Sequence, residues 1–464
     1  MINSKILMLK LRRFVKHLYQ LRRQRLSPRR KITTVGFYSS SLLWILLFCL
    51  LALSGCQTFP ASKSDQVIHI TLWQGINPPP NRDVLQRLVD KFNHTHANIQ
   101  VDSLYVGQQD QQMPKILAAV VGNAPPDLLW YNPTISGQLV ELGAISPLDD
   151  KLTNSSAIKE IDPTLYASMQ YKNQLWSVPF ATNNVGVFYR PSLFKAAGIT
   201  KLPQTWEEFK QVAKKLTRDF NHDGRIDQYG LLLPAGKGEF TVFTWLPFMW
   251  SSGGKLVNDH YQNAAGVILA DNQGAKAALE FWRSLLIDNV AVLSAPERGY
   301  EINDLVTGKV AMQITGPWSL GEFQQSGVDF DVFPIPIKDN PATIIGGENL
   351  FLFKTTLERE QAAFKFIEYA MSADFQTALA LGTGYLPVNL KSRQSPEYQQ
   401  FLEKQPQIKV FLEQAKFGRS RPIFPGYNRI SDNLGRAIEA VLLGKSSPRE
   451  ALTASQQRLD LIFD

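Results

Sequence analysis

Between residues 67 and 132, the sequence alternates between strand-like and helix-like stretches, and this alternation narrows the folds open to the chain. Three stretches have the β-branched, alternating or wholly apolar residues of strands: 67–73, 99–106 and 127–132. Two stretches between them have the residue pattern of helices: 83–96 and 113–123. Because this order is typical of a mainly parallel sheet with helical crossovers, we expect an α/β fold.

The same pattern recurs farther along the chain. Residues 173–199 predict strands followed by a helix, and residues 205–220 predict a helix that begins with a capping box formed by Thr205 and Glu208. Two further stretches have the spacing of amphipathic helices: 275–289 and 358–372. Residues 56–464 number 409, which exceeds one typical hydrophobic core, so we expect two α/β lobes.

The N-terminal region predicts export. Residues 1–55 contain eleven Lys and Arg and no Asp or Glu, and they end in an apolar run at 42–53. A basic head before a short apolar run is typical of a signal peptide, and twelve residues are few for a spanning helix. The alternative is a transmembrane anchor that begins near Val35. The following Leu-Ser-Gly-Cys resembles the lipobox of bacterial lipoproteins, which implies cleavage before Cys56, a lipid on Cys56 and a tether over 56–66.

Charge and cysteine content exclude other classes. The whole chain carries +8, but residues 56–464 hold 38 basic and 41 acidic side chains, a net charge of −3. The basic isoelectric point therefore reflects the export signal, and we expect no nucleic-acid partner. The two cysteines are Cys49, inside the signal, and Cys56, so the processed chain has no disulfide.

Seven segments, taken in order, resemble those of the extracellular solute-binding proteins of bacterial carbohydrate ABC importers, the maltose-binding-like group. They are "KILAAVVGNAPPDLLW", "LVELGAISPLDD", "YKNQLWSVPFATNNVGVFYRPSLFKAAGI", "LPQTWEEFKQVAKKL", "GKVAMQITGPWSL", "GGENLFLF" and "GTGYLPV". The resemblance spans residues 67 to 460.

The resemblance implies a two-lobed periplasmic-binding-protein fold of type II, with a hinge and a ligand cleft between the lobes. It implies an N-terminal lobe over 67–181 plus 333–384 and a C-terminal lobe over 184–332 plus 386–464. The expected function is capture of a sugar or polyol glycoside and its delivery to an ABC permease, without enzymatic turnover or a cofactor. We expect a monomer on the periplasmic or cell-surface face of the membrane, anchored by lipid on Cys56.

Trp318 is the first candidate for the ligand site. A sugar presents apolar C–H faces and hydroxyl edges, so its site needs aromatic faces and a few polar groups. Gly316 and Pro317 precede Trp318 and predict a tight turn that projects the ring. In the maltose binder that this chain resembles, the Trp of this Gly-Pro-Trp stacks on sugar. The alternative is a buried core Trp.

The remaining candidates come from loops, strand ends and lobe crossings, and several of them match positions that face the cleft in the resembled family. They are Trp73, Gln74, Gln108, Gln109, Tyr131, Asn132, Asn183, Trp245, Gly347, Glu348, Tyr385 and Arg421. Asn183 stands where the maltose binder has a ligand-contacting Glu, and an amide both donates to and accepts from hydroxyls. For Arg421, a surface salt bridge is the alternative.

The stretch 219–230 raises the question of calcium. Four oxygen-bearing side chains alternate in it: Asp219, Asn221, Asp223 and Asp227. An EF-hand needs a Glu at loop position 12, where this chain has Gly230, so we expect no EF-hand. Calcium binding and a set of side-chain-to-backbone turns both remain open, away from the sugar site.

Two other functions stay open at this point. An exported glycoside hydrolase would need a pair of carboxylates across the scissile bond, and no motif supplies an evident pair. The same fold could bind glycerol phosphoesters or peptides instead of a sugar. A phosphate would require several convergent Arg or Lys, and the candidate loops hold few besides Arg421.

Overall fold

The structure, a computed structural model, describes residues 67–153, 155–258, 266–295 and 301–463. The predicted signal peptide, the tether and Cys56 lie outside these residues. Within them, no helix combines the length and apolar character that a membrane crossing requires.

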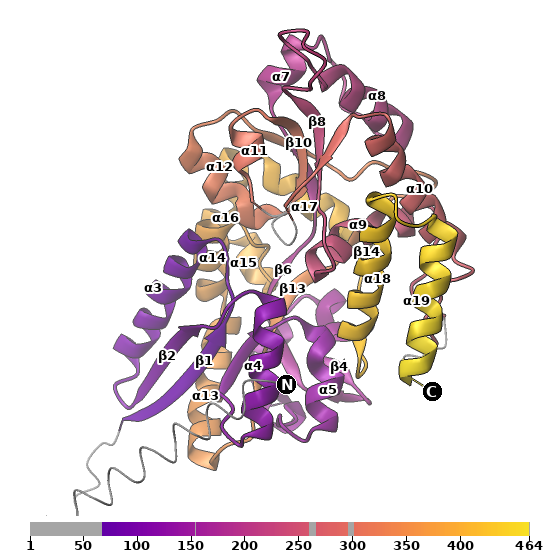
Figure 1. Cartoon of the computed structure of the whole chain (residues 1–464). Helices are drawn as coiled ribbons and strands as arrows, with labels where there is room; N and C mark the ends of the chain where they lie inside the picture. Colours follow the sequence, from indigo (N-terminus) through magenta and orange to yellow (C-terminus); the bar gives the residue numbers. More distant parts are fainter. Residues whose placement is uncertain (1–66, 154, 259–265, 296–300, 464) are drawn as a thin grey trace, which may run out of the picture. The chain divides into compact units, whose positions relative to one another are not determined.

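The first sheet is built mainly from the N-terminal part of the chain (Figure 1). Its strands, in spatial order, are β2 (Ile99–Tyr105), β1 (Ile68–Gln74), β3 (Leu128–Tyr131), β13 (Gly346–Leu352) and β6 (Ser177–Asn183). Strand β1 pairs in parallel with β2 and β3, whereas β13 runs antiparallel to β3 and β6. The predicted mainly parallel α/β arrangement is therefore present, with one antiparallel strand inserted from a distant part of the chain.

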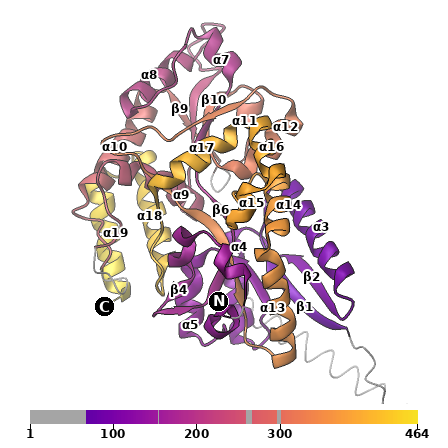
Figure 2. The ribbon, with the colours of Figure 1, turned by 180° about the vertical axis from the view of Figure 1, so that it is seen from behind.

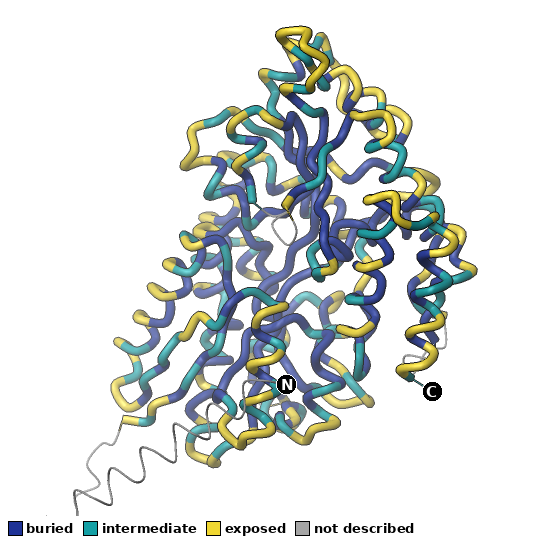
Figure 3. The backbone as a smooth tube through the Cα atoms, viewed as in Figure 1, coloured by how far each residue is buried: buried dark blue, intermediate teal, exposed yellow. Residues whose placement is uncertain are grey.

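Both faces of the first sheet are covered, which explains why every residue of β3 is apolar or aromatic. Leu128 and Trp130 pack on one face, and Leu129 and Tyr131 pack in a separate cluster on the other. Successive strand residues point to opposite faces, so a strand buried on both sides needs apolar residues at every position. Figure 3 shows the strands as the buried interior.

The second sheet forms the other lobe. Its strands, in spatial order, are β11 (Asp331–Phe333), β7 (Gly186–Tyr189), β10 (Val310–Thr315), β8 (Tyr229–Leu233) and β9 (Ala291–Leu293). Strands β10, β8 and β9 are parallel, and β7 is antiparallel to both β10 and β11. Two small ladders join β12 (Thr343–Ile344) to β14 (Gly418–Arg419) and β4 (Gln170–Tyr171) to β5 (Gln174–Leu175).

Helices cover the two sheets. Those before residue 300 are α3 (Pro79–Thr95), α4 (Gln109–Val121), α5 (Ser136–Glu141), α6 (Asp149–Thr153), α7 (Pro191–Ala196), α8 (Trp206–Leu216), α9 (Glu239–Ser251) and α10 (Gln273–Ile287). Those after it are α11 (Asn303–Val306), α12 (Leu320–Ser326), α13 (Leu357–Met371), α14 (Ala373–Thr383), α15 (Leu390–Gln394), α16 (Pro396–Lys404), α17 (Gln407–Gln414), α18 (Tyr427–Leu442) and α19 (Pro448–Phe463). Short 3-10 turns are η1 (Pro133–Ile135), η2 (Ala157–Glu160), η3 (Pro163–Ser168), η5 (Pro317–Ser319) and η6 (Ala415–Phe417). Figure 2 shows α13 to α17 following one another from the first sheet toward the second.

The helix boundaries follow local sequence signals. The capping box predicted for α8 is present, because Thr205 accepts from the Glu208 amide at 3.2 Å and Glu208 accepts from the Thr205 amide at 3.2 Å. Helix α3 begins at Pro79, earlier than the predicted residue 83. Proline is tolerated there because the backbone amides of the first helical turn have no partner within the helix. Helix α4 begins at Gln109, earlier than the predicted residue 113, because Gln108 and Gln111 form a second capping box.

The chain passes between the sheets where β6 leads into β7. At this point the backbone of Thr182 exchanges two hydrogen bonds with Leu386, at 3.2 and 3.0 Å. Gly384, which precedes this pairing, has a φ of 78°. Two segments far apart in the sequence are thus tied together between the lobes.

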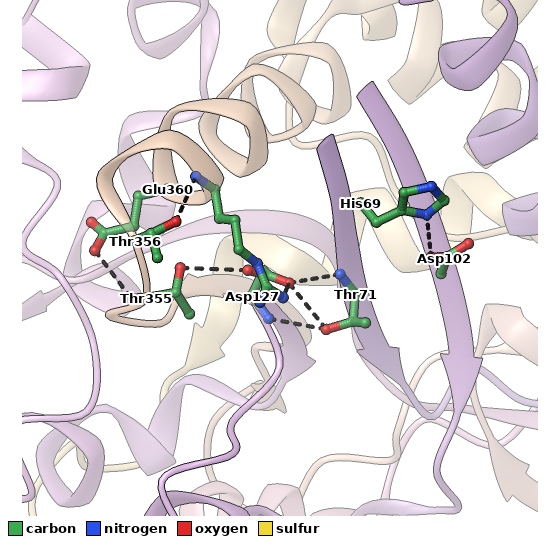
Figure 4. A network of polar contacts seen from close by, with 8 residues as sticks. His69, Thr71, Asp102, Asp127, Thr355, Thr356 and Glu360 are labelled. Atoms are coloured by element: carbon green, nitrogen blue, oxygen red, sulfur yellow. Dashed lines mark hydrogen bonds and ion pairs between the residues drawn. The ribbon is translucent and has the colours of Figure 1, made fainter. Parts of the chain in front are cut away.

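Asp127, just before β3, has a structural role in the first lobe (Figure 4). Its carboxylate accepts from the Thr71 amide at 2.8 Å and lies 2.5 Å from the Arg359 guanidinium, while the residue is fully buried. The Asp127 carboxylate thus joins β1, β3 and α13, because it accepts hydrogen bonds from several donors while it is buried.

Candidate functional site

A cavity of about 410 Å³ lies between the two lobes. The first lobe contributes the β1–α3 loop, the start of α4, Trp130 and the start of β13. The second lobe contributes the start of α9, η5 and Arg421. Eight of the residues predicted from the sequence line it: Gln108, Gln109, Asn183, Trp318, Gly347, Glu348, Tyr385 and Arg421.

Trp318 occupies the turn predicted for it. Strand β10 ends and Pro317 opens η5, so the chain turns and the ring folds back over Gly316. A Cβ on Gly316 would lie 2.1 Å from the Trp318 ring, so only glycine allows this packing. The ring is half-buried, and its centroid lies 6.3 Å from that of Phe243. One face of the cavity is therefore aromatic.

Trp318 also connects the two lobes. Its ring packs against apolar residues of both cores. Its backbone carbonyl accepts a hydrogen bond from Asn81 Nδ2 of α3, at 3.1 Å, and Asn81 is almost fully buried. The aromatic face of the site is thus held in place from the opposite lobe.

Arg421 and Glu239 form a buried ion pair at the cavity. Arg421 Nη1 lies 2.5 Å from Glu239 Oε1, and the arginine side chain is only 4% exposed. Tyr427 and Ser431 donate to the same carboxylate, so Glu239 is held by three side chains. Burial alone would lower the pKa of Arg421, but the Glu239 carboxylate raises it, so the guanidinium stays charged.

Glu348 is the other buried carboxylate of the cavity. It lies on β13 and is 7% exposed, and Gln109 Nε2 donates to its Oε1 at 3.3 Å. Burial raises the pKa of Glu348 to about 7, although Arg421 and the Gln109 hydrogen bond oppose the shift. The preceding Gly347 has a φ of 119°, and a Cβ there would lie 2.1 Å from the Ala181 carbonyl oxygen. Glycine therefore lets β13 approach β6 closely at this point.

Four buried polar atoms at this cavity have no hydrogen-bond partner among the described residues. Two are acceptors, Asn183 Oδ1 and Glu348 Oε2, and two are donors, Trp130 Nε1 and Arg421 Nε. Buried polar atoms in proteins are nearly always paired. Pairing these atoms would take a partner that offers both donors and acceptors.

Tyr131 and Asn132 line a neighbouring cavity of about 540 Å³. This second cavity shares Gln109, Gly238 and Glu239 with the first, so the two are compartments of one cleft. The Tyr131 hydroxyl donates to the Gln109 carbonyl at 3.1 Å, and Asn132 Oδ1 caps η1. Both side chains therefore also have structural partners.

Three sequence candidates do not line either cavity. Trp245 is fully buried in the core, because α9 is buried at every position from Thr241 to Ser251 and the aromatic ring there serves packing. Trp73, on β1, packs against the apolar cluster that contains Leu129 and Tyr131. Gln74 Oε1 accepts a hydrogen bond from the Ile76 amide at 2.9 Å. The loop beyond them, at Gly75, Asn77 and Pro78, reaches the cavity instead.

Sequence reasoning missed Trp130, Glu239 and Phe243, which all line the cavity. Glu239 is the first residue of an otherwise uncharged helix, and a lone carboxylate in that position is a signal that could have been used. Phe243 and Trp130 lie within apolar stretches, where nothing local separates a cavity-lining ring from a core ring.

The 219–230 loop is arranged as a set of turns. Asp219 accepts from the Gly224 amide, Asn221 from the Asp223 amide and Asp227 from the Phe220 amide, at 2.8 to 2.9 Å. Within the described residues, no group of three or more His, Cys, Asp or Glu side chains is placed to hold a metal ion. The loop residues do not line either cavity described above.

Replacing Glu348 with Gln should flatten the pH dependence of stability. A carboxyl whose pKa rises from 4.5 to about 7 on folding favours the folded state fully below pH 4.5. That contribution is lost as the pH rises to 7, which amounts to about 3 kcal/mol. Urea unfolding at pH 5 and pH 8 should show Glu348→Gln losing less stability than the parent. The exposed Glu403→Gln is the control, and matching profiles for parent and Glu348→Gln would contradict the prediction.

Comparisons with known proteins agree with this architecture. The model of the family "Bacterial extracellular solute-binding protein" matches residues 87–408. The maltotriose-binding protein of Pyrococcus abyssi is 22% identical over 381 residues, which cover 80% of this chain and 77% of that protein. The sn-glycerol-3-phosphate-binding periplasmic protein UgpB of Agrobacterium fabrum is 21% identical over 89% of this chain and 97% of its own.

A solved structure shows the same fold. The GacH receptor of Streptomyces glaucescens, determined without ligand and with acarbose, superposes with a TM-score of 0.75 at 22% identity, over 86% of this chain and 98% of that chain. The family match covers more than half of the present sequence. The chain therefore belongs to the bacterial extracellular solute-binding proteins.

Proposed function

We propose that this protein is the substrate-binding lipoprotein of an ABC importer and captures a sugar or polyol glycoside in the cavity at Trp318. The observation that carries the proposal is the set of four unpartnered polar atoms beside an aromatic face. Two donors and two acceptors match hydroxyl groups, each of which both donates and accepts. The Trp318 and Phe243 rings match the apolar face of a pyranose.

A ligand that contacts both lobes would favour the conformation in which the lobes are closed, because only that conformation offers all the contacts. The permease subunits would then recognise the closed form. A relative named for maltotriose binding supports the sugar assignment at the level of ligand class.

A glycerol phosphoester is the second candidate, since relatives carry that name. The charges of the first cavity disfavour it. Its described lining includes four carboxylates, Asp110, Glu239, Glu322 and Glu348, against one guanidinium. That guanidinium, on Arg421, already faces Glu239, whereas a phosphate needs cationic donors free to bind it.

We further propose that the protein breaks no bond. A glycosidase needs an acid and a second carboxylate that is free to act as base or nucleophile. Glu239, one of the four lining carboxylates, is instead engaged by Arg421, Tyr427 and Ser431, and the relatives of this chain are named as binding proteins. Release of product from common glycosides would overturn this part of the proposal.

A thermal-shift screen followed by calorimetry tests the ligand class. Mono-, di- and trisaccharides and glycerol phosphoesters are each added to a chain that begins at residue 57. A ligand at 100 times its dissociation constant stabilises the folded state by about 2.7 kcal/mol, which a melting curve resolves. We expect at least one saccharide to raise the melting temperature. A shift with phosphoesters and none with any saccharide would contradict the sugar assignment.

We also propose that Cys56 carries the lipid and holds the protein, as a monomer, at the periplasmic or cell-surface side of the membrane. Metabolic labelling with a fatty acid should mark the protein, and Cys56→Ser should abolish the label. A label that persists on the variant would contradict the anchor.

A further inference from the structure

The charges around the cavity do not balance at Glu348. The Arg421 guanidinium is in contact with Glu239, at 2.5 Å, and it also acts on Glu348 through space. Two buried carboxylates therefore share one guanidinium. Glu322, on the same lining, has its pKa raised by burial and by the nearby Glu301 carboxylate, so a further negative charge is disfavoured there as well.

Glu348 is also short of hydrogen-bond donors. The residue is more than nine-tenths buried, Gln109 donates to Oε1, and Oε2 has no donor among the described residues. Asn183 Oδ1, equally buried and on the same lining, has no donor either. Two acceptors on the lining of one cavity therefore lack hydrogen-bond donors, which a bound ligand would supply.

A buried, uncompensated carboxylate is costly, and only a proton or a cation can relieve it. A neutral hydroxyl supplies one hydrogen and no charge. A protonated amine supplies two or three hydrogens and a full positive charge at the same place. The Trp318 and Phe243 rings add to this preference, because aromatic faces attract cations.

We propose that the preferred ligand of this cavity is a saccharide or polyol glycoside that carries a protonated amine, and that Glu348 Oε2 accepts a hydrogen bond from that amine. This inference rests on the proposed function, since it names a class of ligand for the same cavity.

The test compares sugars that differ only in this group. Calorimetry at pH 7 measures three β-1,4-linked dimers: cellobiose, the glucosamine dimer and its N-acetylated form. Trehalose and maltose are measured beside their 2-amino and 6-amino derivatives. We expect at least one amino sugar to bind about tenfold more tightly than its hydroxyl parent, because charge-assisted hydrogen bonds are the stronger ones.

Variants assign the preference to Glu348. In Glu348→Gln the amino and hydroxyl forms should bind within about threefold of each other, because the amide removes the charge and keeps the shape. Glu403→Gln removes an exposed carboxylate on α16 and should keep the full preference. Amine binding should also release a proton from Glu348, so its heat should depend on the ionisation enthalpy of the buffer in the parent and not in Glu348→Gln.

The outcomes separate the two proposals. Amino sugars that bind no better than their parents would overturn this inference and leave the sugar-binding function intact. A preference that survives in Glu348→Gln would also overturn it. If no saccharide binds, with or without an amine, the proposed function itself fails.

Discussion

Replacing Arg421 with Met should destabilise the fold by about 3–5 kcal/mol, because it leaves a buried carboxylate without its counter-charge. Glu239 would keep only the Tyr427 and Ser431 hydroxyls as donors. Glu348 would lose the Arg421 guanidinium, whose positive charge lowers its pKa. Denaturant unfolding at pH 7.5 measures the loss, and ligand affinity should fall with it.

Two controls make the Arg421 result interpretable. Arg436→Met breaks an ion pair with Asp432 whose side chains are about half exposed, and exposed pairs contribute at most about 1 kcal/mol. The double variant Arg421→Met/Glu239→Met should recover much of the stability, since it removes both charges. An Arg421→Met protein as stable as Arg436→Met would show that the pair contributes little.

Replacing Trp318 with Ala should weaken ligand binding at least thirtyfold, or roughly 2 kcal/mol, since an aromatic anchor in a binding site commonly costs that much. The ring is half-buried, so the fold should survive the change. Trp318→Phe keeps an apolar face and should recover part of the affinity. Calorimetry with the best ligand from the screen, beside a melting curve, measures both effects.

Trp245→Ala is the matched control for Trp318→Ala. Trp245 is fully buried in the core, so its truncation should cost about 3–5 kcal/mol of stability. Trp318→Ala should therefore lose ligand affinity and keep its stability, whereas Trp245→Ala should lose stability. Unchanged affinity and a collapsed melting temperature in Trp318→Ala would place that residue with the core and contradict its role in the site.

The elements of the fold were largely predictable because their signals are local. Thr205 and Glu208 lie within one helical turn, so their capping box can be read from four residues. The apolar stretch at β3 likewise shows that both faces of its strand are buried. The first sheet also takes in β13, more than 200 residues beyond β3, and no local pattern predicts that pairing.

The site was predictable only in part, because its residues come together from distant parts of the chain. Arg421 was chosen as a bidentate donor, but its partner Glu239 lies 182 residues earlier, and nothing near either residue indicates the pair. Trp318 and Trp245 are the same residue type in apolar surroundings. Only the tight turn at Gly316 distinguishes the ring at the cavity from the ring in the core.

The hydrogen bond from Asn81 to the Trp318 carbonyl has a consequence for kinetics. It joins α3 of one lobe to η5 of the other at the base of the aromatic face. Any motion that separates these elements must break this bond while it withdraws the ring from the bound molecule. The strength of the bond therefore enters the activation barrier for dissociation, and the residence time of the ligand depends on a side chain that does not line its cavity.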